Sequence, residues 1–472
     1  MKILKSIIEF FLYLYIFLLP WQARIIWFQG RINEGPWEYG TMSFYFSEFI
    51  LFILLLSSFV FIILTQEKEK GSKFNFFSLN LYLFAIIVLS FVSTFWAYNQ
   101  SLAFYNFIKL LEGMGLLAIL LKVPLRYKRV ALSFVFSAFF QASLAFWQFL
   151  NQSVWGNKWL GMSSQYPYQG GVSVIEDYFG RWLRAYGTLP HPNILGGFLS
   201  IALLLLLGLF FVSRERRERI LYLLFFPPLV SGLFVTFSRG SWLGFILALF
   251  YLSYLIFWKG QNQRLKTILG NFILIGLTIG ALFSIFFKEQ LFTRLQGRAP
   301  LEVRSEEERM IYFFQAKEII KSNFLNKRYW YRGEGIGNYT LAIYKKIDSR
   351  LPSWRYQPVH NLFILIWAEL GIIGFFIFLI FFYNIFRKIR KGRWVSQIEF
   401  IISLGKIKTQ EIVLFSQKFD QWFIISSSIL LFIGFVSLFD HYFWTLYFGV
   451  ILFWLSLGLW LRNFKADPYS YL

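Results

Sequence analysis

Long apolar runs separated by short polar segments dominate the pattern of this chain. A helix needs about 20 mainly apolar residues to cross a bilayer, and about twelve runs reach or approach that length. We predict membrane-spanning helices at residues 7–22, 43–65, 79–97, 104–121, 130–149, 193–213, 220–236, 241–258, 267–287, 361–386, 422–439 and 442–461. The pattern therefore predicts an all-α integral membrane protein with about twelve transmembrane helices.

The basic residues between these runs indicate an orientation, because lysine and arginine collect in the cytoplasmic loops of membrane proteins. With a cytoplasmic N-terminus, every inside loop between helices is basic, as in RERRER at 214–219. The outside segments hold few basic residues, apart from the long segment 288–359. We therefore predict that both termini are cytoplasmic. The first run lacks a small-residue cleavage site, so we expect a retained helix.

The predicted spans divide the chain into seven segments. These are helices one to five at 1–149, an external loop at 150–192, helices six to nine at 193–287, a large external loop domain at 288–359, helix ten at 360–386, a basic cytoplasmic loop at 387–421, and helices eleven and twelve with a cytoplasmic tail at 422–472.

Three stretches of these loops carry local signals. Ser305 to Glu308 read as a capping box, so we expect a surface helix near 305–321. The run RGEGIG at 332–337 follows no clear strand, so we interpret it as a turn and not as a phosphate-binding loop. The segment 387–421 is basic and partly amphipathic, and we expect it to lie on the inner leaflet.

Composition narrows the classes of protein. Of 472 residues, 57% are hydrophobic and only 15% are charged, whereas soluble domains are about a quarter charged, so the composition argues against a soluble enzyme. The absence of cysteine excludes disulfides, thiolate metal sites and cysteine nucleophiles. Three histidines and no acidic cage predict no metal and no cofactor. The net charge of +22 is interpreted as a topology signal and not as a nucleic-acid site.

Several arginines lie at the predicted outer membrane boundary, where a charge is costly and is often functional. Arg239 lies in a short outer turn, where it either snorkels to lipid phosphate or forms a fixed cation for an anionic substrate. Arg184, with Arg181 nearby, precedes the sixth span, which Asn193 could cap. An ordinary juxtamembrane role is the alternative for Arg184.

A second group combines histidines with carboxylates. His360 lies at the outer mouth of the tenth span, and imidazole suits proton transfer near neutral pH. Glu369 lies inside that span, where a structural ion pair is the simplest interpretation. Asp440 and His441 lie in the tight turn between the last two spans, where capping and packing are the simplest roles. We expect His191 to support local structure.

All these groups lie on one side of the membrane, at the outer ends of helices. A midplane array would favour ion coupling or transport. An array at the boundary favours a substrate with an anionic headgroup and a lipid tail, because arginine binds phosphate oxygens through a planar fork. Charge neutralisation by arginine favours metal-independent chemistry on a phosphate-linked donor.

The stretches of sequence around these residues resemble the bacterial O-antigen ligase and polymerase superfamily, whose members are membrane glycosyltransferases that use polyprenyl-diphosphate-linked glycans. The stretches that carry the resemblance are RAYGTLPHPNILGG at 184–197, TFSRGSWLG at 236–244, HNLFILIWAELGIIG at 360–374 and, more weakly, DHYFWTLYFGVILFWLSLGL at 440–459. In the third, His-Asn is followed by nine residues and then Gly-x-x-Gly, which is the spacing of the ligases.

The resemblance implies roles for individual residues. Arg184 and Arg239 would hold the donor diphosphate, and His360 would be the general base that takes the proton from the acceptor hydroxyl. In-line attack would invert the anomeric centre, with no metal. Possible supporting residues are Arg181, Asn193, Asn361, Glu369, Asp440 and His441. The aromatic and basic stretch NKRYWYRGEGIGNY departs from the short turn of many relatives, so it leaves the acceptor undetermined.

The resemblance implies a bacterial inner-membrane protein whose active site faces the periplasm and whose partners are a polyprenyl-diphosphate-linked glycan donor, an acceptor and the lipid bilayer, with no nucleic acid. Transfer to a lipid A-core sugar is favoured, with polymerisation of repeat units and transfer to a protein hydroxyl as alternatives. From other classes, a polysaccharide flippase and a membrane scaffold stay open.

Overall fold

The computed structural model describes residues 2–65, 77–178, 180–259, 262–325, 330–391 and 409–464. Its long helices are α1 (Lys2–Leu18), α2 (Phe46–Thr65), α3 (Phe77–Ser93), α4 (Gln100–Lys122), α5 (Tyr127–Asn151), α6 (Pro192–Val212), α7 (Arg216–Val235), α8 (Arg239–Ser253), α9 (Gln263–Phe286), α13 (Leu362–Lys391), α15 (Thr409–Val436) and α17 (Tyr447–Arg462). Each predicted span overlaps one of these helices. The described part of the inner-leaflet segment predicted at 387–421 is helical, and residues 392–408 lie outside the described residues.

Among the described residues, eight helices are long and apolar enough to cross a membrane, and three shorter apolar helices accompany them. The prediction of a largely helical chain with several helices able to cross a membrane is therefore confirmed. Twelve crossings stay a prediction.

Two helices form the centre of the bundle. Every residue of the most apolar window of α6 is buried, and α6 packs against α5, α7 and α15. Helix α17 is buried along its length and packs against α4. A helix that is apolar on all sides is expected to be covered on all sides, so α6 and α17 fix the positions of the turns that precede them.

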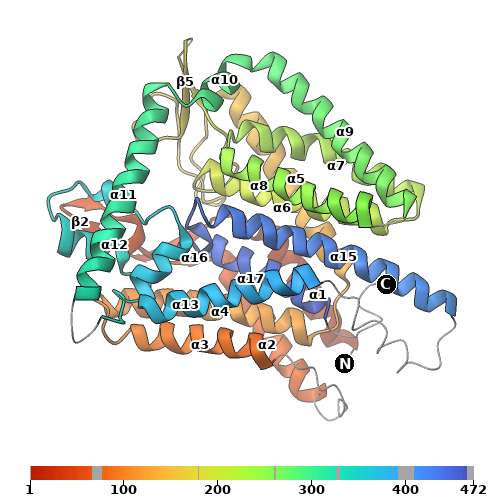
Figure 1. The fold of residues 1–472 in the computed structure, drawn as a ribbon, viewed down its shortest axis with the longest axis horizontal. Coiled ribbons are helices and arrows are strands. Elements are labelled where there is room, and N and C mark those ends of the chain that lie inside the picture. The colour runs from red at the N-terminus through yellow and green to blue at the C-terminus, as the bar shows by residue number, and fades with distance from the viewer. Residues whose placement is uncertain are drawn as a thin grey trace.

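Three strand pairs and four further helices gather at one end of the bundle, opposite the start of α1 (Figure 1). They comprise the antiparallel pairs β1 (Arg24–Phe28) with β4 (Met42–Tyr45), β2 (Arg31–Ile32) with β3 (Gly35–Pro36) and β5 (Val174–Asp177) with β6 (Gly180–Leu183), and the helices α10 (Lys288–Gln296), α11 (Pro300–Leu325), α12 (Tyr339–Ala342) and α16 (Tyr442–Thr445). Helix α11 crosses this end of the bundle at a steep angle to α13 (Figure 1). The pattern of apolar spans predicted none of the three strand pairs.

Helix α11 begins earlier than the predicted surface helix at 305–321. Its first residue is Pro300, which suits the start of a helix because that position needs no backbone N–H donor. The backbone N–H groups of Glu302 and Val303 both bond to the carbonyl of Ala299. Ser305 and its following glutamates therefore lie inside the helix, and the predicted capping box was wrong.

Candidate functional site

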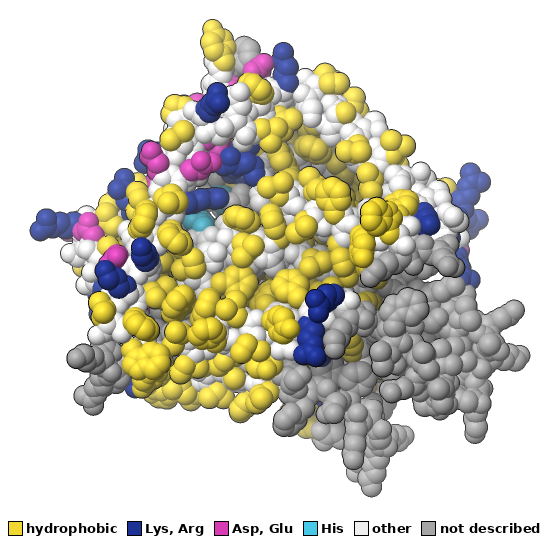
Figure 2. Space-filling model, in the orientation of Figure 1, with side chains coloured by type: hydrophobic (Ala, Val, Ile, Leu, Met, Phe, Trp, Pro, Cys, Tyr) yellow, Lys and Arg dark blue, Asp and Glu magenta, His cyan; other side chains and the backbone are white. Residues whose placement is uncertain are grey.

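Two histidines and one aspartate meet at this end of the bundle. His360 lies just before α13, and Asp440 and His441 lie just before α16. One donor atom from each residue lies within 4.8 Å of the donor atoms of the other two. The centroids of the two imidazole rings are 5.0 Å apart. Figure 2 shows a histidine at the bottom of a recess with basic side chains above it.

Asn193 connects this group to Arg184. Its Nδ2 donates to Asp440 Oδ2 at 3.5 Å, and its Oδ1 accepts from Nη2 of Arg184 at 2.7 Å. Arg184 is only 4% exposed, and its Nε donates to the carbonyl of Thr236 at 2.8 Å. A guanidinium, an amide, a carboxylate and two imidazoles therefore form one continuous polar row.

His191, and not Asn193, caps the N-terminus of α6. Its Nδ1 accepts from the backbone N–H of Asn193 at 3.1 Å, so in this tautomer Nε2 donates to Ser173 Oγ at 2.9 Å. Burial lowers the pKa of His191 to about 3, with the charge of Arg184 adding to the effect. The predicted cap was wrong because α6 starts one residue earlier, at Pro192. The side chain of Asn193 is thereby free to bridge Arg184 and Asp440.

Arg239 is paired with helix α11. Its Nη2 lies 3.3 Å from Glu302 Oε2, and its Nη1 lies 3.4 Å from Glu306 Oε1. The buried Glu302 also pairs with Arg294. Arg239 keeps 29% of its side chain exposed, so it anchors α11 over the bundle while still facing the outside.

Arg309 is a residue that sequence reasoning missed. It lies half-buried on α11, near enough to affect the pKa of His191, His360 and His441. Within the described ranges it has no hydrogen bond or ion pair. In the sequence it ends the run SEEER, which reads as an ordinary polar helix face. The Arg309 guanidinium lies near the histidines only because α11 crosses the bundle at this point.

The two clustered histidines are uncharged at neutral pH. Burial lowers the pKa of both, that of His441 to about 3, and Arg309 adds to the lowering while Asp440 opposes it. Burial alone would raise the pKa of Asp440, but the neighbouring histidines and the backbone N–H of His441 outweigh it, so that pKa is lowered. The group therefore combines a carboxylate with neutral imidazoles.

His360 has a ring nitrogen without a partner. Its Nδ1 is buried without a hydrogen-bond partner among the described residues, and such orphaned groups are rare unless they serve a function. His441, in contrast, commits its Nδ1 to Thr445 Oγ1 at 2.8 Å. Of the two, His360 is the one available to exchange a proton.

Asn361 and Arg181 have positions that hold local structure. Asn361 Oδ1 accepts from the backbone N–H of Ile364 at 3.0 Å, and its Nδ2 donates to the carbonyl of Leu438 at 3.1 Å. This pair of bonds fixes the mouth of α13 against the turn that carries Asp440. Arg181 lies on β6, opposite Glu176 in the β5–β6 pair.

Glu369 binds an indole and not a cation. Its Oε2 accepts from Trp444 Nε1 at 2.8 Å, and the backbone N–H groups of Gly337 and Tyr339 also bond to the carboxylate. The predicted ion pair was wrong, since no cation pairs with Glu369 in the part of the chain that the structure describes. The carboxylate thereby joins α13 to α16, the element that follows His441.

The glycine run at 332–337 closes a break in α13. Gly371 has φ 75° and ψ −174°, which interrupts the helix. The backbone N–H groups of Glu334 and Gly335 donate to the carbonyls of Ala368 and Glu369, each at 2.9 Å. A Cβ on Gly371 would collide with the backbone of this loop. Gly371, separated from His-Asn by nine residues, is therefore the point where the loop at 332–337 docks.

The donor set of His360, Asp440 and His441 also suits a metal ion, because two imidazoles and a carboxylate are common ligands of zinc and related ions. The absence of a metal requirement thus stays a prediction.

A family model described as O-antigen ligase matches residues 225–379. These residues are similar to O-antigen ligases. This match confirms the resemblance to the O-antigen ligase and polymerase superfamily. The matched residues contain Arg239, Arg309 and His360, whereas Arg184, Asp440 and His441 lie outside them. A comparison with curated proteins found no match.

The match and the apolar helices together support a multi-pass bacterial membrane protein of the O-antigen ligase and polymerase type. The residues that complete its polar row are contributed by segments on either side of the matched residues.

Proposed function

We propose that this protein transfers a glycan from a polyprenyl-diphosphate carrier to an acceptor hydroxyl, on the outer side of the bacterial inner membrane. One observation carries the proposal. A neutral histidine with an unpartnered buried nitrogen, His360, stands beside a buried carboxylate and under arginines at one end of a membrane bundle.

His360 is the general base in this proposal. It removes the proton from the acceptor hydroxyl while the oxygen attacks the anomeric carbon of the donor. A positioned base contributes about 10²- to 10⁴-fold to such a step. Asp440 stabilises the imidazolium that forms, because a carboxylate beside an imidazole favours its charged form. His441 holds Asp440 in place through its backbone N–H, which donates to Asp440 Oδ1 at 2.8 Å.

The arginines accept the charge of the leaving group. The bond from the anomeric carbon to the diphosphate breaks, and its electron pair leaves with the polyprenyl diphosphate. Arg309 is half-buried without a partner in the described chain, so it is the first contact for the diphosphate. Arg184 stands behind it in the polar row, and Arg239 joins if the diphosphate displaces the exposed Glu306. A single displacement inverts the anomeric centre.

The first experiment is a transfer assay with the purified full chain in detergent. It supplies a polyprenyl-diphosphate glycan, EDTA and three acceptor classes, namely a lipid A-core sugar, a second lipid-linked glycan and a Ser/Thr peptide. Release of polyprenyl diphosphate together with a glycosylated acceptor is expected for the wild type. His360→Ala should lose the activity by at least about a hundredfold.

Arg309→Gln and Arg304→Gln form a matched pair for the same assay. Both residues lie on α11, but the Arg304 side chain is 58% exposed and pairs with Glu308. Only Arg309→Gln should raise the KM for the donor. If no acceptor causes donor consumption, or if His360→Ala transfers as fast as wild type, the proposal is wrong.

A further inference from the structure

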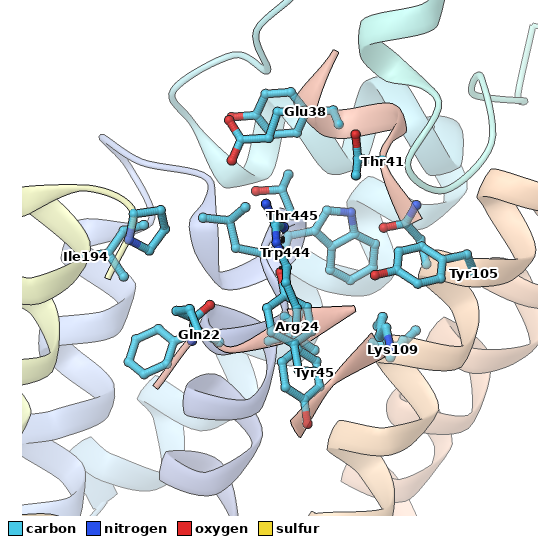
Figure 3. A pocket seen from close by; sticks show the side chains of 18 of the residues that line it. Gln22, Arg24, Glu38, Thr41, Tyr45, Tyr105, Lys109, Ile194, Trp444 and Thr445 are labelled. Carbon is cyan, nitrogen blue, oxygen red and sulfur yellow. Dashed lines mark hydrogen bonds between the residues drawn. The ribbon is translucent and has the colours of Figure 1, made fainter. Parts of the chain in front are cut away.

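A polar cavity of about 110 Å³ lies beside the histidine group. The N-terminal hairpin that carries β1 and β4, helix α4 and the segment around α16 converge on it (Figure 3). Its walls include Arg24, Glu38, Tyr39, Asn106 and Trp444. All of these lie outside the O-antigen ligase match at 225–379.

The cavity touches the catalytic group through His441. Thr445 lines the cavity, and its Oγ1 lies 2.8 Å from His441 Nδ1. The ring of Tyr39, another lining residue, is 6.0 Å from the ring of His441. None of Arg184, Arg239 and Arg309 lines it. The cavity is therefore lined by none of the cations assigned to the donor diphosphate.

The charges around the cavity offset one another. Lys109 lies at its floor, but its Nζ is bound by the buried carboxylate of Glu48 and lies 3.6 Å from Glu112. Arg24 is within electrostatic reach of Glu38 at the mouth. A site for a phosphate would keep a net positive charge, so this cavity suits a neutral ligand.

The lining suits a sugar ring. Small-ligand sites combine aromatic walls with a few placed polar groups, and here Tyr39, Tyr105 and Trp444 stand among polar side chains. Asn106 commits its Nδ2 to the carbonyl of Leu102 at 2.9 Å, which leaves its own carbonyl oxygen for a hydroxyl. A volume of 110 Å³ corresponds to roughly four waters at about 30 Å³ each, so the cavity takes the hydroxyl-bearing edge of a sugar ring.

We infer that this cavity binds the sugar that accepts the glycan, with its reacting hydroxyl turned toward His360. The inference rests on the proposed function, and it distinguishes among the possible classes of acceptor. A lipid-core sugar or the end of a second glycan fits the cavity, whereas a protein Ser or Thr side chain would leave it unfilled. The sequence outside the matched residues 225–379 thus determines the acceptor class.

The test measures sugar binding without any donor. Methyl glycosides of glucose, galactose and N-acetylglucosamine are titrated by saturation-transfer NMR into the full chain. The detergent must lack a sugar headgroup, since such a headgroup would compete for the cavity. We expect binding in the millimolar range. Glu38→Gln and Asn106→Ala should each weaken it about three- to tenfold.

The matched control is Glu34→Gln. Glu34 is an exposed glutamate of the same hairpin and does not line the cavity, so its variant should bind the glycosides as wild type does. Absence of binding to wild type, or equal binding by all variants, would overturn the inference.

A kinetic arm separates acceptor from donor binding. A bound glycoside should become glycosylated in the transfer assay and should be competitive with the acceptor. Competition with the donor alone would identify a donor-sugar site and would overturn the inference. If glycosides bind as expected but donor is never consumed, the proposed function fails while the sugar site stands.

Discussion

Removing the charge of the Asp440 carboxylate is the most specific test of the proposed mechanism. Asp440→Asn removes one negative charge and keeps the shape of the side chain. The remaining amide oxygen can still accept from the backbone N–H of His441, as Asp440 Oδ1 does at 2.8 Å. The change therefore tests charge more than packing.

The expected magnitude follows from the geometry. The donor atoms of Asp440 and His360 lie within 4.8 Å, and at an effective dielectric constant of about 20 two unit charges at that separation interact by about 3.5 kcal/mol. If the transition state carries between half and all of the imidazolium charge, kcat should fall about 20- to 300-fold.

The pH dependence has a defined sign. Asp440 raises the pKa of His360, against the stronger lowering by burial. Without the carboxylate that pKa falls further, so the base stays unprotonated to lower pH. The acidic limb of the kcat profile should therefore move to lower pH while the plateau drops.

The assay is the transfer reaction across a pH series, with the melting temperature of each variant measured in the same detergent. Asp348→Asn is the matched control, because Asp348 lies in the external loop domain and its Oδ1 likewise accepts from one backbone N–H, that of Arg350, at 2.8 Å. A plateau within twofold of wild type for Asp440→Asn, in a protein whose His360→Ala variant is inactive, would refute the electrostatic role. A shift of the limb to higher pH would refute it equally.

Two further predictions concern the external loop domain. Arg309→Gln removes a cation that lowers the pKa of His360, so the acidic limb of its kcat profile should move to higher pH, opposite to the shift for Asp440→Asn; an unchanged limb would contradict the placement of Arg309. Gly371→Ala forces a side chain onto a backbone with φ 75° and brings Cβ to 2.1 Å from the Tyr331 carbonyl, so it should lower stability by about 1–3 kcal/mol or more, measured as a fall in melting temperature. Gly270→Ala on α9 meets nothing within 4 Å and should leave the melting temperature nearly unchanged or slightly raised.

The apolar spans were predictable because each depends only on its own stretch of chain. A helix that must fill the apolar layer needs the length and composition that the sequence states directly. Each predicted span therefore overlaps a helix, and the candidate residues were recognised at the helix ends. Asp440, His441 and His360 could be named for the same reason, since charged and titratable groups are conspicuous beside apolar runs.

The partners of these residues could not be predicted. Glu369 binds an indole from Trp444, and Arg239 pairs with carboxylates on α11; both contacts join segments far apart in the chain. Arg309 could not be recognised because a polar residue on a polar helix face gives no local signal. The cap at His191 was missed because Asn193, the more usual cap, lies two residues further on.

The two backbone hydrogen bonds between the glycine run at 332–337 and α13 restrict how the loop can move. Lifting the loop would strip the carbonyls of Ala368 and Glu369 of their partners, and an amide left unpaired in apolar surroundings costs roughly 2–7 kcal/mol. The outer loop cannot therefore act as a hinged flap over the recess, since each swing would expose backbone that the bilayer cannot solvate. We therefore expect a lipid-linked donor to enter the recess laterally from the bilayer, past a loop that keeps its position. Hydrogen exchange at the Glu334 and Gly335 amides should be as slow with donor as without it.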